Sequence, residues 1–241
     1  MNSICKFKTC RITKFTSYEL QFSTMYKKYR QLDKMMKNSG FLWILFLLLT
    51  TAFKSVAKDT PLIYQIDIKK EIDNTTRIYL SNGLSEANSL GADAILIHMN
   101  TYGGLLEAAD SMRTAILYNP VPVYVFIDNN AASAGALISI ACKKIFMRKG
   151  ANIGAATVVN QTGAALPDKY QSYMRSMIRS TAEAHGKDTI IQGNDTIYKW
   201  KRDPLIAEAM VDERVVVPNL IDTGKVLTFT ADEALQWHYC D

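Results

Sequence analysis

The chain has 241 residues, enough for one domain or two small ones, and its composition is that of an ordinary globular protein. Its formal net charge of +5 is unevenly distributed, because residues 1–57 carry ten Lys and Arg against two Asp and Glu, whereas residues 58–241 carry eighteen against twenty-one. The basic character belongs to the N-terminal segment, and the composition argues against a nucleic-acid-binding surface on the remainder.

An apolar run near the N-terminus, Phe41–Leu49, indicates export. Lysines precede the run and Ser55-Val-Ala57 follows it, which is the order of elements in a secretory signal. The run is shorter than the roughly 20 apolar residues of a spanning helix. We predict a signal peptide or N-terminal membrane anchor at 35–57 and a non-native or disordered extension at 1–34. The domain at 58–241 is expected to be periplasmic or extracytoplasmic, either released or anchored to a membrane.

From residue 58 onward, strand-like and helix-like segments alternate. Strands are expected at 62–68, 94–99, 123–127, 144–148 and 225–230, and helices at 76–89, 105–117, 137–141, 167–185, 205–210 and 231–237. Repeated strand–helix units with short connections predict an α/β domain with a mostly parallel sheet and helices outside it. The last third of the chain is less regular than the rest.

Ser133 is the lone polar residue of a small-residue stretch, Ala131–Ala136, at a predicted strand-to-helix turn. Small neighbours let a substrate backbone approach, and free N–H groups at a helix N-terminus stabilise a developing negative charge. This is the setting that a nucleophilic serine needs. A plain helix cap is an equally good interpretation of these residues alone, because Ser is a preferred N-cap residue.

A nucleophilic serine also needs a base. His98 lies in a predicted buried strand, His185 near a helix C-terminus and His238 in the tail, and structural roles are favoured for all three. Lys169 follows Pro167 at the start of a long predicted helix. A lysine held among apolar groups loses charge stabilisation and can accept the serine proton, whereas an ordinary lysine is simply solvated.

A glycine pair, Gly103-Gly104, follows a predicted buried strand and precedes a predicted helix. Glycines there let backbone N–H groups point into a cleft, and one of them could form an oxyanion hole together with the N–H of Ala134. A tight strand-to-helix turn is the structural alternative. Cys142 and Cys240 are too widely separated to indicate a disulfide scaffold, and no Cys–His spacing suggests a metal site. We expect no metal and no cofactor.

Three segments that occur in this order, Asn100–Gly104, Ala132–Gly135 and Ile153–Ala155, together resemble the Clp protease-like superfamily. The similarity covers about residues 62 to 239 and is strongest to the NfeD-type membrane-bound serine proteases, then to signal peptide peptidase A. Tyr102 replaces the proline of the family's first motif. The valines at 158 and 159 occupy the region where the Clp protease has its histidine.

The resemblance implies a Clp protease/crotonase-like spiral of strand–strand–helix units and an ATP-independent serine endopeptidase. It assigns Ser133 as nucleophile, Lys169 as general base, and Gly104 with Ala134 as oxyanion donors, and Gly103 with Tyr102 would contact the substrate. It further implies apolar or membrane-associated peptide substrates, membrane association and a homo-oligomer, at least a dimer.

Two other classes share the expected fold. A crotonase-type acyl-CoA enzyme uses an oxyanion hole without a Ser–Lys pair, but the predicted export signal argues against that cytoplasmic chemistry. A non-catalytic membrane quality-control scaffold would keep the fold and leave Ser133 inert.

Overall fold

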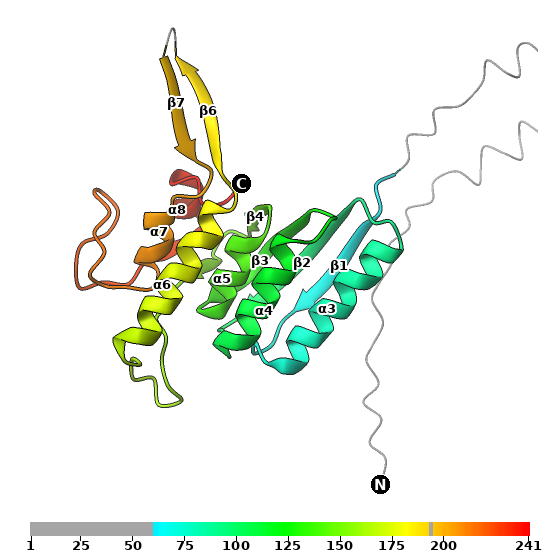
Figure 1. The fold of residues 1–241 in the computed structure, drawn as a ribbon, viewed down its shortest axis with the longest axis horizontal. Coiled ribbons are helices and arrows are strands. Elements are labelled where there is room, and N and C mark those ends of the chain that lie inside the picture. The colour runs from blue at the N-terminus through cyan, green and yellow to red at the C-terminus, as the bar shows by residue number, and fades with distance from the viewer. Residues whose placement is uncertain (1–59, 193–194) are drawn as a thin grey trace, which may run out of the picture. The chain divides into compact units, whose positions relative to one another are not determined.

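A six-stranded sheet organises the structure, a computed structural model that describes residues 60–192 and 195–241. The segments predicted at 1–34 and 35–57 lie outside these residues. The strands follow the order β1-β2-β3-β5-β8, with β4 beside β3, and all neighbours are parallel except β5 and β8 (Figure 1). The strands are β1 (Ile63–Ile68), β2 (Ala94–Thr101), β3 (Val123–Ala132), β4 (Lys144–Met147), β5 (Asn152–Gly154) and β8 (Thr228–Thr230).

Helices cover one face of this sheet (Figure 1). They are α3 (Asn74–Ser89), α4 (Leu106–Leu117) and α5 (Ala134–Ala141). Further along the chain, α6 (Asp168–Glu183) packs against α5, α7 (Pro204–Ala209) packs against α6, and α8 (Ala231–Gln236) follows β8 directly. Strand side chains alternate between the two faces, so Ile66, Ile97 and Val125 are fully buried against the helices while their sequence neighbours are partly exposed. The predicted α/β class with a mostly parallel sheet is confirmed.

The third strand is longer than the sequence predicts. Its first half pairs with β4 and its second half with β5, so that β3 continues to Ala132 rather than ending at Ile127. The asparagines at 129 and 130 interrupt the apolar pattern, but the backbone N–H of Asn130 donates to Asn100 Oδ1 at 3.3 Å. The following helix starts at Ala134, three residues before the predicted start. Ser133 is therefore the single residue between β3 and α5.

Side-chain caps begin two of the helices. The Asp73 carboxylate accepts a hydrogen bond from the Thr76 N–H at the start of α3. Thr230 and Glu233 form a reciprocal capping box at the start of α8.

The short strand β5 and a hairpin were both missed in the sequence. Between α6 and α7 the chain forms an antiparallel hairpin, β6 (Lys187–Gln192) and β7 (Asp195–Trp200), as a separate two-stranded sheet. Its residues are almost all exposed, so the hairpin lacks the polar–apolar alternation that reveals a half-buried strand.

Candidate active site

Ser133 stands at the carboxyl end of β3, where ligands of open α/β sheets commonly bind. Its backbone adopts φ 55° and ψ −119°, and its N–H donates to the Gly154 carbonyl at 2.9 Å. Although Ser133 occupies the N-cap position of α5, its hydroxyl makes no capping hydrogen bond. The observed geometry therefore leaves the hydroxyl available, which weighs against the plain cap interpretation.

The glycine loop after β2 lies directly against this serine. A Cβ placed on Gly103, whose φ is 109°, would approach Ser133 Cβ to 2.6 Å and Ser133 Oγ to 3.1 Å. Only a residue without a side chain fits between the loop and the serine. Gly103 is buried beneath Ser133 and does not line the cleft described below.

The loop is fixed so that one N–H stays unpaired. The Ile72 N–H donates to the Gly103 carbonyl at 2.8 Å, and the Leu105 N–H donates to the Ile72 carbonyl at 2.7 Å. These bonds flank Gly104, whose own N–H makes no hydrogen bond with any residue of 60–192 or 195–241. The N–H of Ala134 likewise has no partner within those ranges. Both residues line the same cleft as Ser133.

The cleft around Ser133 has a volume of about 1050 Å³. Tyr102, one of the two predicted substrate contacts, lines it and is 81% exposed. Most of the other lining side chains are apolar or aromatic: Leu105, Leu106, Val158, Val159, Leu166, Tyr170, Tyr173, Met174 and Val226. Three carboxylates line it as well, from Glu71, Glu107 and Asp110. Such a lining suits an extended apolar chain more than a charged cofactor.

Lys169 lies beside the cleft rather than in it. The residue is exposed in the first turn of α6, and its Nζ lies 4.8 Å from the ring centroid of Tyr170. Tyr170 lines the cleft, whereas Lys169 does not. The pairing of Lys169 with Ser133 therefore stays a prediction.

The loop that forms one wall of the cleft is fastened to α6 by Gln171. The Val158 N–H donates to Gln171 Oε1 at 3.0 Å, and Gln171 Nε2 donates to the carbonyls of Val158 at 2.7 Å and Leu166 at 3.2 Å. This amide is nearly buried and satisfies three backbone groups of the loop. Sequence analysis missed this residue, because a glutamine inside a helical pattern normally indicates a solvated position.

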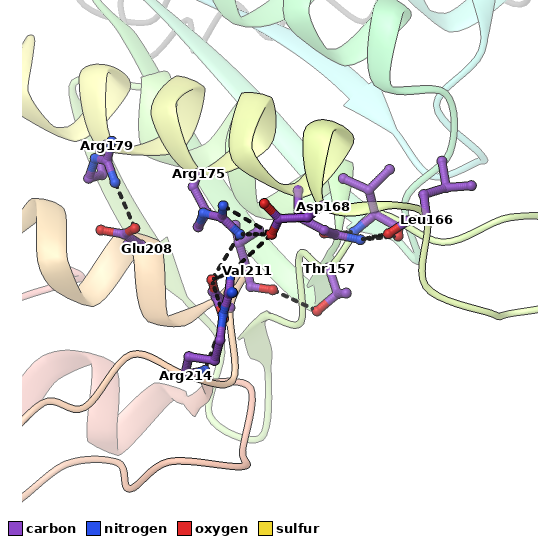
Figure 2. A network of polar contacts seen from close by, with 11 residues as sticks. Thr157, Leu166, Asp168, Arg175, Arg179, Glu208, Val211 and Arg214 are labelled. Atoms are coloured by element: carbon purple, nitrogen blue, oxygen red, sulfur yellow. Dashed lines mark hydrogen bonds and ion pairs between the residues drawn. The ribbon is translucent and has the colours of Figure 1, made fainter.

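A charged network anchors the start of α6 to the turn after α7 (Figure 2). Arg175 Nη1 contacts Asp168 Oδ1 at 3.2 Å and Asp212 Oδ2 at 2.9 Å, and Arg214 Nη2 contacts the same two carboxylates at 3.0 and 2.7 Å. Hydrogen bonding from Arg214 lowers the pKa of Asp212 to about 2, and hydrogen bonding from Arg175 lowers the pKa of Asp168. Both carboxylates are therefore ionised at neutral pH, and the network fixes the turn that carries Lys169.

None of the three histidines lines the Ser133 cleft. His98 lies on β2, 3.3 Å from Asp67 and 3.6 Å from Asp128. His185 Nε2 lies 2.7 Å from the Ile140 carbonyl oxygen and 2.7 Å from Arg202 Nη1, and His238 is exposed. The structural roles predicted for the histidines agree with these positions.

The sequence of this chain matches a known family and two characterised relatives. The family model described as NfeD1b, N-terminal domain, matches residues 62–194. The chain belongs to the NfeD1b family. It is 30% identical over 180 residues to "Membrane protein NfeD1b" of Bacillus subtilis, and 28% identical over 138 residues to "Membrane-bound protease PH1510" of Pyrococcus horikoshii. These alignments cover 74% and 54% of this chain but only 38% and 31% of the two relatives.

Solved structures show the same fold. The stomatin-specific membrane-bound protease 1510-N superposes with a TM-score of 0.60 at 24% identity, covering 76% of this chain and 79% of that one. A ClpP1 variant of Listeria monocytogenes gives 0.51 at 22% identity, covering 73% and 88%. The predicted resemblance to NfeD-type proteins and the Clp protease-like fold are thus confirmed. Both curated relatives are named as membrane proteins, yet none of the helices in 60–192 and 195–241 is long and apolar enough to cross a bilayer.

Proposed function

We propose that this NfeD1b-family protein is a serine endopeptidase that cleaves apolar or membrane-associated peptides outside the cytoplasm. The observation that carries the proposal is the position of the uncapped Ser133 hydroxyl in a cleft that also contains the unpaired N–H groups of Gly104 and Ala134. The protease relatives support the same reaction class. Membrane association and assembly into a homo-oligomer belong to this proposal.

In the proposed reaction, Ser133 Oγ attacks the scissile carbonyl carbon and transfers its proton to Lys169 Nζ. The carbonyl oxygen gains negative charge and accepts hydrogen bonds from the Gly104 and Ala134 N–H groups, each worth about 2.7–4 kcal/mol in hydrolases. Collapse of this intermediate breaks the C–N bond, and the amine leaves with the proton from Lys169. Water then hydrolyses the acyl-enzyme by the same proton transfers.

Lys169 takes part only if its side chain turns from the Tyr170 ring toward Ser133. We expect this turn to accompany substrate binding, because an apolar chain in the cleft displaces water and contacts Tyr170. The Asp168 network holds the backbone of this turn in place meanwhile. Catalytic geometry that tightens only in the substrate complex is common among hydrolases.

The test is hydrolysis of apolar peptides by the full-length chain in mild detergent. Ser133→Ala should lower kcat at least about a thousandfold without lowering the melting temperature. Lys169→Ala should lower kcat by a comparable factor, whereas Lys149→Ala, which removes an exposed lysine elsewhere, should leave it unchanged. Undiminished hydrolysis by Ser133→Ala would refute the mechanism, and undiminished hydrolysis by Lys169→Ala would require another base.

One observation favours the non-catalytic scaffold as the second candidate. Lys169 is exposed and outside the cleft, which is the position of an ordinary solvated lysine. A scaffold would bind an apolar peptide in the Ser133 cleft with the same affinity in wild type and Ser133→Ala, and neither protein would cleave it. Peptide binding measured by fluorescence anisotropy alongside cleavage separates the two functions.

A further inference from the structure

The β6–β7 hairpin, called the arm below, extends from the C-terminal end of α6 (Figure 1). It forms a separate two-stranded sheet. Neither outer edge of the arm pairs with a strand elsewhere in the part of the chain that the structure describes. At the base, Lys187 Nζ lies 4.1 Å from the Trp200 ring centroid and fixes the first cross-strand pair. The edges beyond this pair are open.

This arm exposes four large apolar or aromatic side chains. Ile191 is 76% exposed and Tyr198 66%, and Ile190 and Ile197 are also exposed. A two-stranded hairpin alone is marginally stable in water, and an open apolar edge is a template for pairing with another chain. The arm therefore has the properties of a segment that is completed by a partner.

The charges of β7 are complementary to those of a second, antiparallel β7. Asp195, Ile197 and Lys199 alternate along one face of the strand, and neither charged residue forms an ion pair with any described residue. Asp188, which lies opposite Lys199 in the hairpin, contacts Lys201 instead, at 3.8 Å. Lys199 and Asp195 are thus both available for pairing.

Antiparallel pairing of two β7 strands about a two-fold axis at Ile197 brings these groups together. In that register, Ile197 faces its own copy, and each Asp195 faces a Lys199 of the second chain. Two opposite-charge pairs therefore flank one apolar pair, and each such cross-strand pair stabilises a sheet. Strand β6 has no comparable register. Its two charged residues, Lys187 and Asp188, are adjacent, so in an antiparallel β6–β6 pair they face each other only if the two strands overlap by just these two residues.

We propose that the β6–β7 arm is a dimerisation element, in which β7 pairs with β7 of a second copy to form a four-stranded sheet. A lipid surface is the weaker fit for the arm, because the charged Asp195 and the polar Gln192 stand at the turn end that would have to enter the bilayer first. The proposal names the pairing element of the homo-oligomer included in the proposed function, but it concerns a surface remote in sequence from Ser133, so that loss of the dimer and loss of peptide hydrolysis are measured separately.

A charge swap tests the pairing in the full-length chain, by sedimentation velocity in mild detergent. Asp195→Lys and Lys199→Asp should each weaken the dimer by about tenfold or more, because two attractive pairs become repulsive. The double variant, Asp195→Lys with Lys199→Asp, should restore the wild-type dissociation constant to within a few-fold. Asp188→Lys, a matched change on β6, should change the dissociation constant of the dimer little.

A cysteine cross-link tests the register. In a background with the four native cysteines replaced, Ile197→Cys should form a covalent dimer on oxidation, because facing residues of antiparallel strands meet the distance of a disulfide. Ile190→Cys, directly opposite Ile197 in the hairpin, should form no covalent dimer. A monomeric wild type, a dimer unaffected by the charge variants, or an equally efficient cross-link through Ile190→Cys would overturn the proposal.

Discussion

Ser133 combines a positive φ of 55° with a hydroxyl that makes no capping bond. For a residue other than glycine, such a conformation costs on the order of 1–3 kcal/mol, and it tends to persist at functional sites where the surroundings enforce it. Here the enforcing contacts are the hydrogen bond from Ser133 N–H to Gly154 and the close approach of Gly103. The conformation turns the serine out of the sheet and into the cleft.

Replacing Gly103 with alanine tests this arrangement. The added methyl group would meet Ser133 Cβ at 2.6 Å, so the serine must move, and we expect peptide hydrolysis to fall at least about a hundredfold. Gly150 has a similar positive φ of 90° but no atom within 4 Å of an added Cβ. Gly150→Ala therefore isolates the backbone cost, and equal activity of the two variants would show that the contact with Ser133 does not matter.

Part of the candidate site could be predicted from residue types and order. Ser133, Gly104 and Ala134 follow predicted strand ends, and parallel strands bring their carboxyl ends to one edge of the sheet. The Lys169 rotamer could not be predicted, since it depends on the Tyr170 ring beside it. Gln171 was missed because its three partners belong to a loop whose path the sequence does not specify.

At the scale of elements, the C-terminus of α5 is held by a buried cation. Arg202 is 5% exposed, and its Nη1 lies 2.7 Å from the Ile140 carbonyl, 2.5 Å from the Cys142 carbonyl and 2.7 Å from His185 Nε2. A cation at a helix C-terminus interacts favourably with the helix dipole. Burial, followed by the charge of Arg202, lowers the pKa of His185 to about 4. The histidine is therefore neutral in the folded protein at neutral pH.

This lowered pKa predicts acid sensitivity. Between about pH 6.5 and pH 4 the unfolded chain binds a proton at His185 that the folded chain does not, so the free energy of unfolding should fall as the pH is lowered through this range. His185→Gln, which keeps a polar partner for Ile140, should flatten that slope in urea unfolding experiments. His238→Gln changes an exposed histidine and should leave the pH slope of the wild type unchanged. An unchanged slope in His185→Gln would contradict this account.

The network at the start of α6 predicts a stability effect of its own. Asp212→Asn removes the carboxylate that Arg175 and Arg214 share, and we expect the free energy of unfolding to fall by about 1–3 kcal/mol at pH 7. The loss should shrink between about pH 4 and pH 2, where the wild-type carboxylate itself becomes protonated. Asp222→Asn, at an exposed position, is the control, and equal melting temperatures for both variants would refute the prediction.

At the scale of the whole molecule, strand–helix alternation is sufficient to predict the α/β class and the parallel sheet. It does not predict that β3 is shared between β4 and β5, because two asparagines interrupt its apolar pattern. The β6–β7 arm was missed for a different reason, since its pairing depends on cross-strand contacts rather than burial. The second half of β3 and the β6–β7 arm could not be predicted because their residues are polar or exposed.

The measurement that tests the central claim most directly is covalent labelling of the full-length chain with a fluorophosphonate, followed by peptide mapping. We expect a single adduct on Ser133, formed slowly, prevented by an apolar peptide in the cleft, and accompanied by a proportional loss of hydrolysis. Hydrolysis that persists in fully labelled protein, or that is lost when the label sits on another serine while Ser133 is unmodified, would contradict the assignment of Ser133 as the nucleophile.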